Sequence, residues 1–211
     1  PPLHHPADAA AWRTFASGDE VLTLQADPRD ANRLWAGTES AGVVVWDALA
    51  GTFAQFVAPA QAGLPSNRVY DIAFDAAGTA WLATAGGVVR ADGVVWPSWH
   101  VADGLPSDVV RTVVVQADGT VWASGDAGIA RMAPGDDRFT VVARDTFTRF
   151  SRAAKKGPGA GGAIASLIDG RGRIWFAHGR DRVDEDRAAM SYYDPEERAW
   201  HHVTSVGPGG N

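Results

Sequence analysis

The sequence repeats itself around four tryptophans, and this periodicity constrains the fold more than any other feature. Trp35, Trp81, Trp122 and Trp175 each stand in a short apolar run that follows a turn rich in Gly and Asp. Successive members of this set are 46, 41 and 53 positions apart. A period of roughly 40 to 50 residues indicates that one supersecondary unit has been copied, and such a unit cannot bury its apolar face alone. We therefore expect a repeat architecture of four similar units.

Each unit contains four segments with the composition of β-strands. Residues 69–74 and 109–115 are dominated by β-branched and aromatic side chains over a length typical of strands. The Asp and Gly turns that follow favour a hairpin to the Trp-bearing strand. A third strand follows a second Gly-containing turn, and an aromatic, more polar segment such as 94–101 supplies a fourth. The sequence thus predicts an all-β fold, a β-propeller of four-stranded antiparallel blades.

The repeats also divide the chain into segments. An N-terminal segment with Trp12 resembles the outer strand of a preceding or latching blade, and four blades follow it. Because the last blade has its own fourth segment at Trp200, a latch is redundant, and we expect the four blades to belong to a larger ring. The remaining blades could lie on another chain. The predicted segments are 1–18, the blades 19–62, 63–103, 104–161 with an insertion at 145–161, and 162–211 with a charged turn at 178–187.

Composition narrows the class of protein. The 211 residues include 24 Gly, 12 Pro and nine Trp, and they contain no apolar run long enough to predict a membrane span. The net charge of -6, with both signs interspersed, argues against a nucleic-acid partner, whose signature is a basic face. The absence of Cys excludes disulfides, thiolate metal sites and cysteine nucleophiles.

The motifs GLPSNRV, from Gly63, and GLPSDVV, from Gly104, resemble the start of the two-component regulator propeller repeat. In both blades an Asp or Asp-Gly turn, then WLAT or WASG, and then GGV or AGI complete the resemblance, which is weaker in the first and last blades. The resemblance implies a sensor propeller, often a ring of about seven blades, that binds ligands such as oligosaccharides without catalysis. It also implies an extracytoplasmic location, periplasmic or secreted.

The blade topology predicts where a ligand would bind. The loop that leads into the first strand and the turn between the second and third strands emerge at the same end of a blade, and these loops converge around the channel. Carboxylate, amide and guanidinium groups there suit hydrogen bonds to a sugar or to a partner protein. Ser-Asn and Ser-Asp before a strand are, alternatively, ordinary turn formers. The candidates are Glu39, Asn67, Arg68, Asp108, Asp126, His178, Arg180 and Asp181.

Two other functions compete with ligand sensing. The repeated Asp-Gly-x-x-Trp pattern also resembles propellers of the streptogramin lyase type, which hold a divalent metal with histidines and a carboxylate. Only His178 is placed near the channel, and the neighbours His201 and His202 point to opposite faces of a strand. We therefore expect no metal site, no cofactor and no catalysis. The second alternative is a protein-interaction scaffold within a larger multidomain protein.

Overall fold

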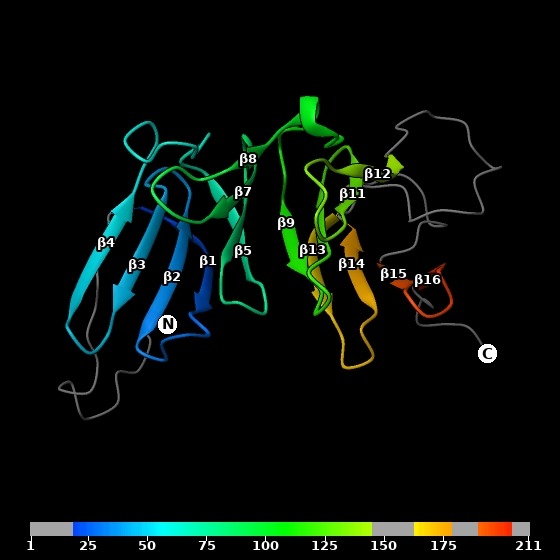
Figure 1. Cartoon of the computed structure of the whole chain (residues 1–211), viewed down its shortest axis with the longest axis horizontal. Coiled ribbons are helices and arrows are strands. Elements are labelled where there is room, and N and C mark those ends of the chain that lie inside the picture. Colours follow the sequence, from blue (N-terminus) through cyan, green and yellow to red (C-terminus); the bar gives the residue numbers. More distant parts are fainter. Residues whose placement is uncertain (1–18, 145–162, 179–189, 204–211) are drawn as a thin grey trace, which may run out of the picture.

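A computed structural model describes residues 19–144, 163–178 and 190–203. The N-terminal strand predicted in 1–18, the insertion at 145–161 and all of the charged turn except its first residue lie outside the described residues. The described part forms four antiparallel sheets of four strands each, and within each sheet the strands follow one another in chain order. Figure 1 shows the sheets standing side by side in a row, from blade 1 in blue to blade 4 in orange and red. The predicted all-β fold of four-stranded propeller blades is confirmed.

The strands of the four blades have similar lengths, except for the short β8 of blade 2. Blade 1 consists of β1 (Val21–Ala26), β2 (Arg33–Thr38), β3 (Val43–Asp47) and β4 (Thr52–Phe56). Blade 2 consists of β5 (Val69–Phe74), β6 (Ala80–Thr84), β7 (Gly87–Ala91) and β8 (Ser98–Trp99). Blade 3 consists of β9 (Thr112–Val115), β10 (Val121–Gly125), β11 (Gly128–Met132) and β12 (Thr140–Arg144). Blade 4 consists of β13 (Ala163–Ile168), β14 (Ile174–His178), β15 (Met190–Asp194) and β16 (Ala199–Val203).

The fourth strand of blade 2 is shorter than the segment 94–101 that the sequence predicts. Only Ser98 and Trp99 form β8. Pro97 has no N–H to donate to the ladder, although its carbonyl accepts a hydrogen bond of 2.9 Å from the Arg90 N–H. The Trp96 N–H turns instead to the carbonyl of Ala62 at 2.9 Å, and the Trp96 side chain is buried. Residues 94–97 of this blade therefore do not form a regular outer strand.

A hydrogen bond joins the turn before a second strand to the tryptophan of that strand. The Asp169 Oδ2 atom accepts a hydrogen bond of 2.9 Å from the indole N–H of Trp175, six residues later. Gln116 holds Trp122 in the same way at 2.8 Å. In these turns the first side chain therefore fixes the ring on the next strand, and the same Asp169 carboxylate accepts backbone N–H groups of its own turn.

The core lies between the blades. The face of each blade that carries its second-strand Trp, here called the Trp face, packs on the opposite face of the next blade. Trp35 and Val43 of blade 1 thus cluster with Ile72 and Leu82 of blade 2. The next two interfaces repeat this arrangement around Trp81 and around Trp122. The tryptophans are evidence for fold, because blades in the described part are held together through them.

Candidate functional site

The first strands place the candidate face. β5 contacts β1 on one side and β9 on the other, and β9 also contacts β13. The first strands thus adjoin one another where a closed propeller has its channel. Val21 and Val69, at the start of β1 and β5, pair with Thr38 and Thr84, at the end of β2 and β6. The loops before the first strands and the turns after the second strands therefore share one end of the molecule, as the topology predicts.

Five side chains from three blades form a continuous set at this end, here called the mouth row. The Arg68 guanidinium, before β5, pairs with the Glu39 carboxylate after β2. Arg68 also forms a side-chain hydrogen bond with Tyr70. The Arg111 guanidinium lies over the Tyr70 ring at 4.5 Å and pairs with Asp126, after β10, at 3.3 Å. The mouth row is therefore Glu39, Arg68, Tyr70, Arg111 and Asp126.

The mouth row is polar, balanced in charge and open to solvent. The pKa of Arg68 is raised, first by its hydrogen bond with Tyr70 and then by the charge of Glu39. The side chains of Arg68 and Asp126 are 47% and 62% exposed. Ion pairs at this exposure contribute little to stability, because water competes for both charges. Both guanidinium groups can therefore exchange their carboxylate partners for a ligand at low cost.

Two members of the mouth row, Tyr70 and Arg111, were not among the sequence-based candidates. The ladder between β5 and β6 shifts register between Val69 and Asp71, so Tyr70 sits in a β-bulge. Arg111 holds the corresponding place before β9, and its N–H donates to the Ser124 carbonyl at 2.8 Å. A bulge re-aims a side chain out of the strand alternation. The sequence signal that could have identified them is their position, since Tyr70 and Arg111 each directly follow a buried valine at or just before the start of a first strand.

Asn67 and Asp108 hold loops in the structure. The Asn67 Oδ1 atom accepts a hydrogen bond of 2.7 Å from the Ala58 N–H. The Asp108 Oδ1 atom accepts one of 2.7 Å from the Val101 N–H, at the equivalent place in the next blade. Each oxygen ties the end of a fourth strand to the start of the following first strand. Their predicted ligand contacts stay predictions, and the turn-former alternative accounts for the contacts that the structure shows.

Of the blade 4 candidates, only His178 belongs to the described residues. The His178 Nε2 atom lies 2.6 Å from the Ser191 Oγ atom, which belongs to β15. Arg180 and Asp181 lie outside the described residues. His201, on the outer strand β16, stacks on Tyr192 with ring centroids 4.6 Å apart and pairs with Glu197 at 2.9 Å. Within residues 19–144, 163–178 and 190–203, no three His, Cys, Asp or Glu side chains are grouped as a metal site.

A second polar layer connects the first strands of three blades. The Asp71 Oδ2 atom, on β5, accepts hydrogen bonds from the Thr112 hydroxyl at 2.8 Å and from the Val113 N–H at 3.0 Å. The Thr112 hydroxyl also contacts the Ser166 hydroxyl of β13. Burial raises the pKa of Asp71, and the hydrogen bonds from Val113 and Thr112 oppose this shift. The hydrogen bonds of these groups therefore join the first strands of neighbouring blades beside the channel.

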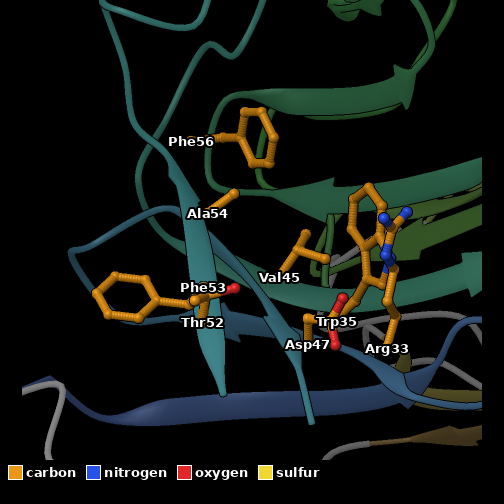
Figure 2. Close-up of a pocket in the computed structure, with 8 residues that line it drawn as sticks. All are labelled: Arg33, Trp35, Val45, Asp47, Thr52, Phe53, Ala54 and Phe56. Carbon is orange, nitrogen blue, oxygen red and sulfur yellow. The ribbon is translucent and has the colours of Figure 1, made fainter. Parts of the chain in front are cut away.

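A hollow of about 330 Å³ lies elsewhere, on the Trp face of blade 1. Figure 2 shows Arg33, Trp35 and Asp47 on one side of it and Phe56 at its other end. None of the mouth row lines it. The residues that line it are Arg33, Trp35, Val45, Asp47, Thr52, Phe53, Ala54 and Phe56.

Among the described residues, no helix is long and apolar enough to cross a membrane.

Comparison with known proteins supports the resemblance drawn from the repeats. Residues 63–86 match the family described as Two component regulator propeller. No curated protein sequence matches the chain. The resemblance to this repeat family is thus confirmed over the start of blade 2, where the GLPSNRV motif stands.

Solved structures with the same fold include extracellular domains and an enzyme. Two extracellular domains assigned to hybrid two component systems of B. thetaiotaomicron superpose with TM-scores of 0.65 and 0.64 at 18% and 17% identity. They cover 88% and 90% of this chain, which spans 23% and 25% of theirs. Virginiamycin B lyase of Staphylococcus aureus superposes with a TM-score of 0.61 at 10% identity, over 90% of this chain and 57% of the lyase. The likeness establishes a propeller fold, of which this chain forms a part.

Proposed function

We propose that this chain is a non-catalytic recognition propeller that binds a small polar ligand, such as an oligosaccharide, at the mouth row. The observation that carries the proposal is the placement of two arginines around one tyrosine at the channel end. Arg68 and Tyr70 come from blade 2, whereas Arg111 comes from blade 3. A ligand held by all three would therefore bridge two blades.

The chemistry of the mouth row suits a saccharide. The guanidinium groups of Arg68 and Arg111 offer several N–H donors in a fixed plane, and Glu39 and Asp126 offer acceptors for hydroxyl groups. The Tyr70 ring offers a flat apolar surface, and its polar end is hydrogen-bonded to Arg68. Such a mixture of a flat ring with oriented donors and acceptors fits a ring-shaped ligand that carries many hydroxyl groups.

The similar structures favour a sensing role outside the cytoplasm. Two of them are extracellular domains assigned to hybrid two component systems. This chain spans about a quarter of their length. A role in signalling is therefore proposed for the whole protein and not for this chain alone. We infer that the chain serves as an extracytoplasmic recognition region, periplasmic or secreted, and that any output is generated by other segments.

Calorimetric titration with short neutral and uronate-containing oligosaccharides tests the proposal. Arg111→Ala is expected to weaken binding about tenfold or more, because a charge-assisted hydrogen bond is lost. Arg33→Ala is the matched control, since Arg33 is also a half-exposed arginine, paired with Asp30 at 3.4 Å, but at the opposite end of a blade. Its binding constant should be unchanged.

The control also separates the mouth row from the hollow, which Arg33 lines. If Arg33→Ala abolishes binding and Arg111→Ala does not, the ligand occupies the hollow and the proposed site is wrong. If no oligosaccharide binds and a protein is captured through Arg68 and Arg111 instead, the scaffold alternative replaces the sensor.

A further inference from the structure

The hollow of about 330 Å³ on the Trp face of blade 1 borders the interface with blade 2. Of the residues that line it, Trp35 belongs to the apolar cluster that joins the two blades, and Val45 and Phe56 pack against that cluster. Small-ligand sites have volumes of about 300 to 1,000 Å³, so the hollow has room for a compact ligand. Since the mouth row takes no part in it, the hollow is a second candidate site on this chain.

The position that faces the repeat tryptophan across the sheet is different in blade 1. In blades 2 and 3 the third strand places Arg90 and Arg131 there, and in blade 4 it places Tyr192. Blade 1 has the short side chain of Val45 at this position, and the still shorter Ala54 faces Val45 from the fourth strand. Both line the hollow. The hollow therefore lies where the other blades carry a longer side chain beside the tryptophan.

Blade 4 shows which groups fit this row of positions. The Tyr192 ring lies 4.5 Å from the Trp175 ring, measured between centroids. The His201 ring stacks on Tyr192 at 4.6 Å, with an angle of 11° between the ring planes. Blade 1 has Val45 and Ala54 in place of these two rings. A planar aromatic group of a ligand therefore matches the space that two aromatic side chains occupy in blade 4.

One end of the hollow carries two opposite charges. Arg33 and Asp47 are partners across β2 and β3, and Figure 2 shows both on the same side of the hollow. The Asp47 Oδ1 atom accepts hydrogen bonds from the N–H groups of Leu49 and Ala50 at 3.0 and 2.8 Å, which hold the carboxylate in place. The Arg33 Nε atom lies 3.4 Å from Asp30, and the guanidinium has further N–H donors. A cation and an anion of a ligand can therefore be bound side by side.

We propose that the hollow binds a free aromatic amino acid. The ring of the ligand lies over Val45 and Ala54. Its ammonium group pairs with Asp47, and its carboxylate pairs with Arg33. A zwitterion provides a partner for each charge, and its ring covers the apolar floor of the hollow. The inference does not depend on ligand binding at the mouth row.

Calorimetric titration of the full chain with L-phenylalanine tests the proposal. The double variant Val45→Tyr, Ala54→His gives blade 1 the two rings of blade 4. It should weaken binding about tenfold or more, because the added rings occupy the hollow. Val101→Tyr is the matched control, since Val101 is 52% exposed between blades 2 and 3 and does not line the hollow. It should leave the affinity unchanged, and circular dichroism confirms that each variant is folded.

Two analogues that each lack one charge test the ion pairs. Phenethylamine has no carboxylate, and 3-phenylpropanoate has no ammonium group. Asp47→Asn keeps an oxygen for the turn N–H groups, so it should weaken L-phenylalanine and phenethylamine about tenfold but not 3-phenylpropanoate. Arg33→Gln should weaken L-phenylalanine and 3-phenylpropanoate but not phenethylamine. Asp136→Asn, exposed in the equivalent turn of blade 3, is the control and should weaken none of them.

The same titrations can overturn the proposal. If the unmodified protein does not bind L-phenylalanine, the hollow is not an amino-acid site. Unchanged affinity in the folded double variant would place the ligand elsewhere, and equal weakening of all three ligands by Asp47→Asn would exclude the ammonium pairing. Loss of binding in Arg111→Ala but not in Asp47→Asn would place the amino acid at the mouth row. Oligosaccharide titrations test the proposed function separately, so the two proposals can fail independently.

Discussion

The interfaces between blades and the mouth row lie close together, but they are built from different groups. The interfaces hold large apolar side chains such as Trp122 and Leu82, which are at most 1% exposed. The mouth row holds exposed ion pairs such as that of Arg111 and Asp126. Burial of apolar surface supplies most of the stability of a fold, whereas exposed ion pairs supply little. The side chains that stabilise the fold are therefore different from those of the proposed binding site.

The largest expected effect is at an interface between blades. Trp122→Ala should lower the free energy of unfolding by about 3 to 5 kcal/mol, because it leaves a cavity against Phe176 and Ile174 of the next blade. Urea denaturation followed by circular dichroism measures the change. Leu49→Ala, at an exposed position, should change the same quantity by about 0.5 kcal/mol or less. Equal effects for the two variants would break the distinction between the regions.

A smaller effect is expected in the polar layer beside the channel. Thr112→Val keeps the shape of the side chain but removes the hydroxyl that Asp71 accepts, so it should cost about 1 to 3 kcal/mol of unfolding free energy. The exposed Thr52 serves as the control, and Thr52→Val should be close to neutral. Urea denaturation of both variants at neutral pH measures the difference. A neutral result for Thr112→Val would mean that apolar contacts alone join these first strands.

Two carboxylates should respond to pH in opposite directions. The pKa of Asp71 is raised by burial, so its folded state binds a proton more readily than its unfolded state. Its contribution to stability is therefore present below the ordinary pKa of 3.8 and is lost as the pH rises through the raised pKa of the folded state. The pKa of Asp169 is lowered, chiefly by its hydrogen bond with Arg173 and then by that with Trp175. Its contribution is present above 3.8 and is lost as the pH falls further.

Asn substitutions measure these contributions. The unfolding free energy of the unmodified protein minus that of Asp71→Asn should grow as the pH is lowered from neutral toward 3.8. The corresponding difference for Asp169→Asn should instead shrink below 3.8. Denaturation curves over a pH series provide both differences. The assignment of the two environments would be wrong if both differences changed in the same direction.

The smallest effect on stability is expected in the mouth row. Arg111→Ala removes the contact with Tyr70 and the ion pair with Asp126, and it should change the free energy of unfolding by about 1 kcal/mol or less. Thermal unfolding with and without an oligosaccharide separates this effect from binding. A loss as large as that of Trp122→Ala would show that the mouth row also supports the fold.

The sequence predicted the architecture well because its signals are local and repeated. A Gly or Asp turn, a Trp-bearing strand and a second Gly turn recur in each copy, so a single misread segment does not change the fold. The shortened outer strand at Trp96 and Pro97 was missed, because it depends on Trp96 fitting against blade 1 and not on strand propensity. Contacts between blades decide such details.

The sequence by itself determined the blade, the repeat and the end of the blade at which charged loops gather, because hydrophobic period and turn chemistry act over a few residues. The tertiary structure decided which of those charged residues meet. It separated Asn67 and Asp108, which close loops, from Arg68 and Glu39, which pair across two blades. It also brought Tyr70 and Arg111 into the mouth row from two blades. Their contact depends on the β-bulge at Tyr70 and on the packing of one blade against the next, and neither can be read along a single strand.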